Sequence, residues 1–235
     1  RVIRCVTFEA EVWGCTYGTA FNYNAEANTD DGSCIQAITQ DNIHSAVDLW
    51  CSDPASAESS YGHISNWNVS DVTDMTELFQ DKTDFNDDIS AWDVSSVTNT
   101  FRMFHNANVF NQDIGGWNVS NITSMRQMFH NANIFNQDIG DWNVSNVTNM
   151  EAMFAETDAL NANLGDWDVS SVNNMQSMFY GSNFNGDISN WDVSNVTNMW
   201  FIFSNSSLFN QDISSWDMSN VNKPQGMFKN ASSFN

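Results

Sequence analysis

Residues 139–154 read I-G-D-W-N-V-S-N-V-T-N-M-E-A-M-F, and close copies of this stretch recur along most of the chain. The tryptophan marks the register of the repeat. Its seven copies are separated by 25, 25, 25, 25, 24 and 25 residues: Trp67, Trp92, Trp117, Trp142, Trp167, Trp191 and Trp216. A fixed period of this length is typical of proteins built from stacked structural units.

Other apolar residues keep the register of the tryptophan. An Ile or Leu lies three residues before each Trp, a Val or Met lies two residues after it, and a Phe lies twelve residues after it. One unit of about 25 residues cannot bury its own apolar face, so neighbouring units must pack against each other. We therefore expect residues 61–235 to form one stack of seven repeats.

The spacing of the apolar residues changes within each unit. Trp and Val are two residues apart, which places both on one side of a short strand. Met125, Met128 and Phe129 follow at i, i+3 and i+4, which is one face of a short helix, and Thr148 with Glu151 has the pattern of a capping box. The units thus predict an α/β repeat solenoid of the leucine-rich-repeat kind: a right-handed coil with a parallel strand sheet on one side and short helices on the other.

Two polar columns accompany this core. We expect a ladder of asparagines to bind the turn backbone from unit to unit: Asn86, Asn111, Asn136, Asn161, Asn185 and Asn210. A column of aspartates, interrupted by Asn163, lies four residues before the tryptophans: Asp88, Asp113, Asp138, Asp187 and Asp212. Like charges at about 4.8 Å repel. We therefore expect each Asp to accept hydrogen bonds from turn amides, with exposure to solvent or bridging by cations as the alternatives.

The two ends of the repeat region differ. Residues 36–60 lack the repeat and predict a capping helix, because four apolar residues have helical spacing: Ile43, Ala46, Val47 and Trp50. No comparable cap follows the last unit, and the sequence stops within a repeat at residues 234–235. We therefore expect either a longer chain or end-to-end stacking on another copy or on another extracellular protein, as in a filament or array.

Residues 1–35 predict a separate, cysteine-containing module. The chain has four cysteines, all toward its N-terminus, and no C-x-x-C pair: Cys5, Cys15, Cys34 and Cys51. This pattern favours disulfides formed in an oxidising compartment over zinc binding. Three pairings of four cysteines are possible, and we predict Cys15–Cys34 within the module and Cys5–Cys51 to the capping helix.

The same module carries closely spaced oxygen-bearing side chains before Gly32: Asn24, Glu26, Asn28, Asp30 and Asp31. Carboxylate and amide oxygens are ligands that calcium prefers, so calcium is a candidate cofactor here. The spacing follows an EF-hand loop only loosely and lacks its bidentate Glu. An Asx-rich turn is the alternative interpretation.

The large excess of acidic over basic residues limits the classes of molecule that the chain is expected to bind. Seven Lys and Arg stand against 29 Asp and Glu, which gives a formal net charge of −22. Such a surface argues against binding to nucleic acid or to anionic membranes. No run of 18 apolar residues is present, so no segment is predicted to insert into a membrane.

Candidate catalytic and metal-binding residues are few. Nearly every polar residue of the repeats recurs, whereas catalysis needs a unique, convergent group of residues, so we do not expect an enzyme. His105 and His130 share one position in adjacent units. Without a third ligand, we interpret them as a surface pair rather than a metal site. Four methionines at helical spacing beside Phe are predicted core residues: Met103, Met128, Met153 and Met178.

The unit W-D-V-S-N-V-T-N-M around Trp191, with F-N-Q-D-I at residues 209–213, resembles the BspA-type leucine-rich-repeat surface proteins. The resemblance covers residues 61–235, and the A-V-x-x-W of residues 46–50 agrees with it. The segment from Gly14 to Cys34 is similar to a short Cys module of secreted proteins. These resemblances imply an extracellular or cell-surface protein of the kind implicated in adhesion, with no catalytic residues.

Two hypotheses for function follow. The first is an extracellular structural or assembly module, a subunit or segment of a coat, appendage or filament. The alternative is a cell-surface adhesin that binds a glycan or protein through the strand face, along one stripe: Asn68, Asp93, Asn118, Asn143, Asp168, Asp192 and Asp217.

The chain also carries several N-glycosylation sequons, which are expected in a secreted glycoprotein. They begin at Asn68, Asn118, Asn121, Asn143, Asn146, Asn195, Asn205 and Asn230. We expect Asn205 and Asn230, on the helix side of their units, to be the more exposed.

Overall fold

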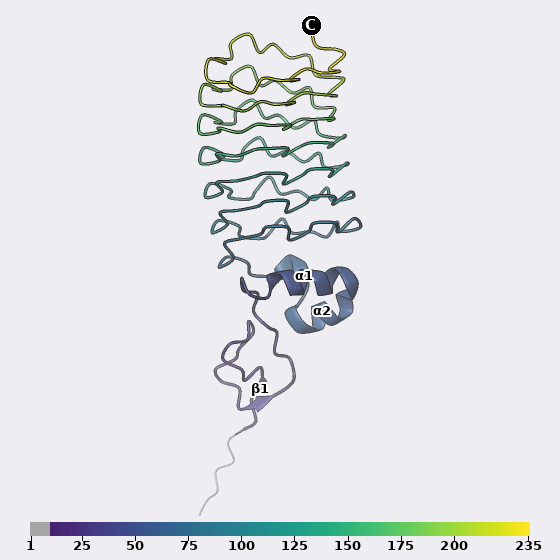
Figure 1. The fold of residues 1–235 in the computed structure, drawn as a ribbon. Helices are drawn as coiled ribbons and strands as arrows, with labels where there is room; N and C mark the ends of the chain where they lie inside the picture. Colours follow the sequence, from purple (N-terminus) through teal and green to yellow (C-terminus); the bar gives the residue numbers. More distant parts are fainter. Residues whose placement is uncertain (1–9) are drawn as a thin grey trace, which may run out of the picture.

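A computed structural model describes residues 10–235 of the chain. A small N-terminal module is followed by two helices and then by a stack of coils along one axis (Figure 1). The elements are β1 (Trp13–Gly14), β2 (Thr29–Asp30), α1 (Ile43–Ser52), α2 (Pro54–Tyr61) and a 3-10 turn (Ile64–Asn66).

The N-terminal module is held by one short sheet and one disulfide. Strands β1 and β2 pair in parallel, with Trp13 opposite Thr29. The predicted disulfide between Cys15 and Cys34 is present. Cys5 lies outside the described residues, so its predicted bond to Cys51 stays a prediction.

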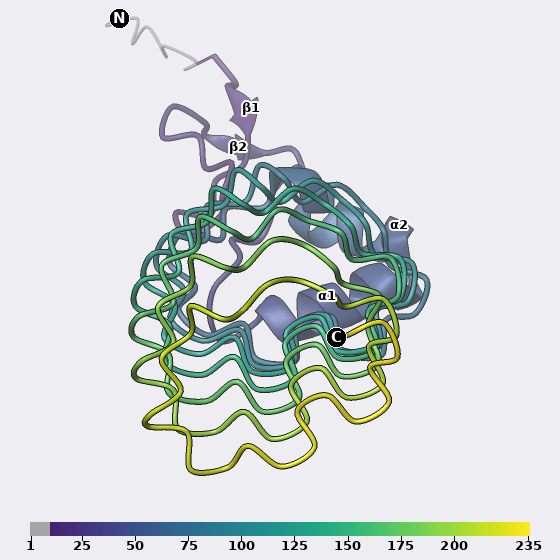
Figure 2. The same cartoon turned by 90° about the horizontal axis from the view of Figure 1, so that it is seen from above.

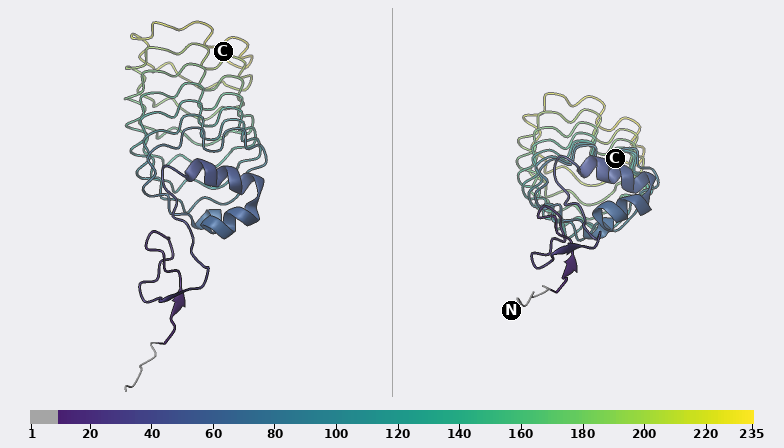
Figure 3. Two further views of the ribbon diagram at one scale, coloured as in Figure 1. Left: turned by 60° about the horizontal axis from the view of Figure 1, so that its bottom comes forward. Right: turned by 90° about the horizontal axis from the view of Figure 1, so that it is seen from below.

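The segment expected to form a capping helix forms α1 and α2, which lie at one end of the stack (Figure 3). The apolar face of α1 is buried, with Ile43 and Val47 fully inaccessible. Helix α1 ends at Ser52 because Pro54 disfavours the helical conformation of Asp53, the residue before it. Asp53 then caps α2 by accepting a hydrogen bond from the Ser56 amide.

From Trp67 onward the chain forms coils that lie over one another when the stack is seen along its axis (Figure 2). Successive coils are joined where the Thr98 amide donates to the Thr73 carbonyl, and the Thr123 amide donates to that of Thr98. One isolated parallel bridge joins each coil to the next, starting with Asp74 and Asn99. Each coil therefore corresponds to one repeat of the sequence.

The predicted α/β solenoid of the leucine-rich-repeat kind is wrong. Within residues 10–235, the helices are α1, α2 and the 3-10 turn, all of which precede Trp67, and the sheet is the β1–β2 pair. The coils have neither the predicted strand sheet nor the predicted short helices. They consist of consecutive turns.

The predicted helix fails because two residues of each coil adopt a left-handed backbone. In the first coil these are Glu77 (φ 58°) and Asp81 (φ 59°), and the same positions have positive φ in every later coil. A left-handed residue cannot continue a right-handed helix. Amide groups instead alternate: Leu78 donates within its turn to Met75, whereas Phe79 donates to Met103 of the next coil. The i, i+3, i+4 spacing still turns these side chains into the core.

The predicted strand fails because the backbone near each Trp binds itself. The Val72 amide donates to the Val69 carbonyl, and the Ser70 amide donates to Oδ1 of Asn68. Asn and Asp side chains compete in this way with a β ladder. Trp67 and Val69 are nevertheless both buried, as their spacing of two predicts.

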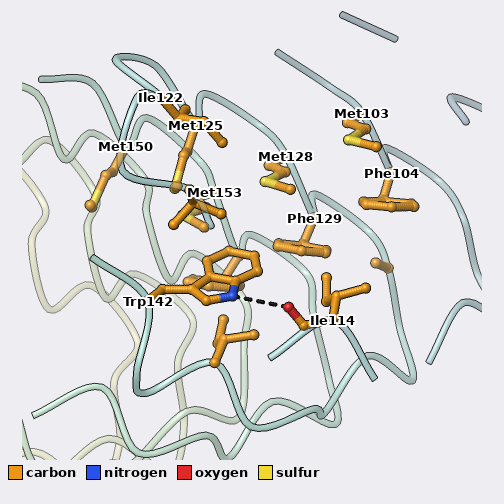
Figure 4. Packing of buried hydrophobic residues seen from close by; sticks show 14 of the residues in the cluster. Met103, Phe104, Ile114, Ile122, Met125, Met128, Phe129, Trp142, Met150 and Met153 are labelled. Carbon is orange, nitrogen blue, oxygen red and sulfur yellow. Dashed lines mark hydrogen bonds between the residues drawn. The ribbon is translucent and has the colours of Figure 1, made fainter. Parts of the chain in front are cut away.

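The core consists of columns of like side chains. The rings of Phe79 and Phe104 stack at 5.3 Å, and this column continues through the later coils. The four methionines predicted to be core, among them Met128 and Met153, are fully buried (Figure 4). The indole Nε1 of Trp142 donates to the carbonyl of Ile114 in the preceding coil, and the corresponding tryptophans of the other coils do the same at 2.9–3.2 Å.

The predicted aspartate column is confirmed, and the asparagine ladder is confirmed except between Asn161 and Asn185. The Asn111 amide donates to Oδ1 of Asn86, and Asn136 does the same to Asn111. Each member of the aspartate column accepts the amide two residues later, as Asp88 does from Ser90 at 2.9 Å. These bonds satisfy turn backbone that would otherwise be unpaired.

Candidate binding face

Comparison of the coils with one another shows which positions are constrained by packing and turns and which are not. The core columns hold nearly the same residue in each coil, whereas several other columns differ from coil to coil, among them positions 9, 10 and 13 after each Trp. We call these three columns the variable face. They are Thr76, Phe101, Arg126, Glu151, Gln176, Trp200 and Gln225; Glu77, Arg102, Gln127, Ala152, Ser177, Phe201 and Gly226; and Gln80, His105, His130, Ala155, Tyr180, Ser204 and Lys229.

The left-handed turns of each coil hold the backbone of the variable face in place. The column that contains Gln127 has positive φ throughout, and its amides donate to the next coil, as Gln127 does to the carbonyl of Glu151. Members of all three columns line one hollow, which places them on the same side of the stack. Side chains of unrelated chemistry are therefore arrayed on a regular, hydrogen-bonded backbone.

The first part of the face is a cluster of planar groups. The guanidinium carbons of Arg102 and Arg126 lie 4.8 and 5.1 Å from the centre of the Phe101 ring. Arg102 Nε donates to Gln127 Oε1 at 2.6 Å, and Arg126 Nε lies 3.1 Å from Glu151 Oε1. A cation–π contact at such an exposed site stabilises by about 0.5–1 kcal/mol. The cluster is thus held in place by several modest contacts.

A hollow of about 280 Å³ lies beside this cluster. It is lined by Gln127, His130, Glu151, Ala152, Ala155, Glu156, Gln176, Ser177 and Tyr180. The hollow exists because one coil carries alanines where its neighbours carry larger residues: Ala152 follows Gln127 in its column, and Ala155 lies between His130 and Tyr180 in another. The two alanines are buried and supply an apolar floor.

The rim of the hollow is polar and partly held by hydrogen bonds. Gln127 Oε1 accepts from Arg102, and Gln176 Oε1 accepts from Asn198 Nδ2 at 3.0 Å. Glu151 is held by Arg126 and by Asn174 Nδ2. Each glutamine therefore keeps its Nε2 group available as a donor.

His105 and His130 lie at the edge of this region with their ring centroids 4.7 Å apart. Both were predicted to form a surface pair, and both are half-buried. Burial lowers the pKa of each imidazole below its ordinary value, and the neighbouring Arg102 lowers both further. In the described part of the chain, no group of three or more His, Cys, Asp or Glu side chains is placed to hold a metal ion.

The predicted binding stripe is exposed in every coil: Asn68, Asp93, Asn118, Asn143, Asp168, Asp192 and Asp217. Each Oδ1 accepts the amide of the Ser two residues later, as in Asp93 with Ser95 at 3.0 Å. Hydrogen bonds from these serines lower the pKa of Asp93, Asp192 and Asp217. The stripe thus has a structural role in the turns, and its role in binding stays a prediction.

The candidate calcium ligands lie in a loop whose amides bind several of the same oxygens. Asn24 Oδ1 accepts the Glu26 amide, Asp30 Oδ1 accepts the Gly32 amide, and Asp31 Oδ1 accepts the Ser33 amide. Asn28 Oδ1 accepts the Val12 amide. These bonds match the Asx-rich turn, which was the alternative interpretation. Calcium binding stays a prediction.

The sequon asparagines are all exposed: Asn68, Asn118, Asn121, Asn143, Asn146, Asn195, Asn205 and Asn230. Exposure therefore does not single out Asn205 and Asn230 as expected. The Nδ2 groups of Asn121, Asn146 and Asn195 donate to serine carbonyls of the preceding coil, and that of Asn230 donates to Oδ1 of Asn205.

A family described as "Mycoplasma protein of unknown function, DUF285" matches residues 53–167 and 156–235. The chain belongs to the DUF285 family. The matched DUF285 region contains α2 and every coil, and therefore the whole variable face. Neither the curated proteins nor the solved structures contain a match to the chain. In the part that the structure describes, no helix has the length and apolar character needed to cross a bilayer.

Proposed function

We propose that this DUF285 chain is a non-catalytic recognition module of an extracellular or cell-surface protein, an adhesin that binds through its variable face. The observation that carries the proposal is the location of the differences between repeats. The stack repeats what packing and turns require, and three of the columns that vary lie on one side and converge on the Phe101 cluster and the neighbouring hollow.

The scaffold suits recognition because it holds the face rigidly. Backbone bonds join each coil to the next, and each buried Trp adds one more, such as that from Trp142 to Ile114. A preorganised surface loses little conformational entropy on binding. Stacked repeats also present extended surfaces that can contact a large partner.

The polar groups of the face support binding rather than catalysis. Glu151 is engaged by Arg126 and Asn174, and Arg102 is engaged by Gln127. Side chains that hold each other by hydrogen bonds are suited to presenting a fixed surface to a partner. A general acid or base, by contrast, must be able to exchange a proton with a substrate atom within hydrogen-bond reach.

The proposal moves the binding surface away from the predicted strand face. Replacing Phe101 and Trp200 with Ala should weaken binding to a natural glycan or protein partner at least tenfold, because exposed aromatic side chains commonly dominate interfaces. Asp166→Ala, an exposed site outside the variable face, is the matched control. Surface plasmon resonance against extracellular proteins and immobilised glycans measures both. Loss of binding in the control with full binding in the aromatic variant would overturn the proposal.

A structural role is a second candidate, favoured by the unbroken core. The Phe column of Phe79 and Phe104 runs on through Phe203 and Phe228, with ring planes at 2–14° to one another. Such a stack makes a stiff spacer in a coat or filament. Sedimentation velocity over a range of concentrations tests self-association, and a constant monomer would count against the filament version.

A further inference from the structure

We propose that the hollow between His130 and Tyr180 binds one neutral pyranose ring of a glycan. This inference rests on the proposed recognition function and names the ligand class of the same face. It is carried by the shape of the hollow, by its apolar floor and by the mixture of donors and acceptors at its rim.

The shape comes from two small residues. Ala152 and Ala155 are 6% and 2% exposed, and they form a floor where neighbouring coils carry glutamine or serine in one column and histidine or tyrosine in the other. Tyr180 adds an aromatic ring at one side. At about 280 Å³ the hollow lies at the lower limit of small-molecule sites. It therefore suits one small ring better than an extended ligand.

The floor and the tyrosine suit the C–H faces of a sugar ring. Aromatic side chains bury apolar area while their polar end stays at the surface. A pyranose has the complementary division, because its C–H groups lie on the ring faces and its hydroxyls project from the edge. An apolar floor with a polar rim can therefore contact both parts of the ring at once.

The rim of the hollow offers both hydrogen-bond donors and acceptors, which suits a neutral sugar better than a charged ligand. Gln127 and Gln176 have their Oε1 atoms bound by Arg102 and Asn198, and neither Nε2 has a hydrogen-bond partner within residues 10–235. These groups offer donors. Glu156 is exposed, and its Oε2 lies 3.8 Å from His130 Nε2, beyond a normal hydrogen bond. It offers acceptors.

Only a ligand that both donates and accepts satisfies this rim. A hydroxyl does both, whereas an ammonium group only donates and a carboxylate only accepts. A cation in the hollow would lie unfavourably against the NH₂ groups of Gln127 and Gln176. An anion would be repelled by Glu151 and Glu156. The net charge of −22 further disfavours sulfated or uronic acid glycans.

Calorimetric titration of the full chain tests the inference. The probes are neutral gluco-, manno- and galacto-hexaoses, a hexauronate and a hexalysine peptide. We expect binding of at least one neutral hexaose and none of the hexauronate. An asparagine-linked neutral glycopeptide, titrated in parallel, shows whether the sugar is recognised in a polysaccharide or in a glycoprotein, since the tighter ligand identifies the source.

Two variants and one control locate the binding. Ala155→Tyr fills the hollow with the residue that the next coil already carries at this column, and should weaken binding at least tenfold. Gln176→Glu keeps the acceptor that Asn198 uses but removes the donor, and should weaken binding three- to tenfold. Asp166→Tyr places a tyrosine at an exposed position outside the variable face, and should leave the affinity unchanged.

Several outcomes would overturn the inference. One is hexaose binding that Asp166→Tyr weakens and Ala155→Tyr does not. Another is binding of hexalysine in preference to every neutral hexaose. A protein partner held by Phe101 and Trp200, with no neutral sugar bound at millimolar concentration, would reject the sugar site while leaving the proposed recognition function standing.

Discussion

Trp142 donates its indole N–H to the carbonyl oxygen of Ile114, 3.1 Å away in the preceding coil. The indole is buried, and its counterparts from Trp92 to Trp216 repeat the bond. The residue that identifies the repeat in the sequence thus joins each coil to its neighbour by packing and by a hydrogen bond together.

Trp142→Phe should lower the free energy of unfolding by about 1–3 kcal/mol. The substitution removes apolar volume from the core and removes one of the two hydrogen bonds that the Ile114 carbonyl accepts, the other coming from the Trp117 amide. Urea denaturation monitored by circular dichroism measures the change. Trp200→Phe is the matched control, because Trp200 is 40% exposed, and it should change stability by less than about 1 kcal/mol. Equal effects would contradict this role of the buried indole.

Substitutions at Ser177 test the turn-built backbone. Ser177 has φ 55°, a conformation that glycine adopts without strain and that β-branched residues resist. Ser177→Gly should therefore leave stability unchanged or raise it, and Ser177→Val should lower it by about 1–3 kcal/mol. A helix at this position would give a clear loss with glycine, because glycine is among the poorest helix formers.

Acidification should destabilise the chain through the histidine pair. The folded state holds His105 and His130 with pKa values below the ordinary 6.5, so the unfolded chain binds protons first as the pH falls. Stability should therefore decrease from about pH 7 through the unfolded pKa near 6.5 and down to the lowered folded values. Thermal melts from pH 7.5 to 5 measure this. The double variant His105→Gln, His130→Gln should flatten the curve in that range.

A second pH effect should appear at lower pH, from the turn aspartates. Hydrogen bonds from Ser189 and Ser214 lower the pKa of Asp187 and Asp212 below the ordinary 3.8. Their contribution is present above that value and is lost as the pH falls through the lowered folded pKa. Asp212→Asn keeps an Oδ1 acceptor but cannot titrate. Its melting temperature should depend less on pH between 5 and 2 than that of the parent, and an identical dependence would contradict the assignment.

The sequence was sufficient to predict what sits in the core but not the path of the backbone. The spacing of Met125, Met128 and Phe129 predicted their burial correctly, yet a helix and a series of turns both satisfy i, i+3 and i+4. One left-handed position of each coil, in the column of Asp81 and Asn106, is held mostly by Asn, Asp or Gly, which favour positive φ, whereas the other, in the column of Glu77 and Gln127, is not. Local residue preferences therefore indicated only one of the two left-handed positions, and the other depends on bonds to the next coil.

The candidate site could have been found in part from the sequence. Aligned on the tryptophan, the repeats show which columns vary, and the column of Ala155 and Tyr180 is visible there. The stripe of Asp93 and Asp168 was predicted as the binding surface because it recurs in every unit, whereas the residues of the hollow differ from unit to unit. The hollow and the orientation of the Gln176 amide depend on contacts between coils, and only the structure shows them.

The most direct test of recognition by the variable face is hydrogen–deuterium exchange of the full chain with and without its bound partner or neutral hexaose. The account predicts increased protection in the turns at residues 126–130, 151–156 and 176–180, and no change at the stripe residues Asp93, Asn143 and Asp192. Protection confined to the stripe, with the variable face unchanged, would contradict it.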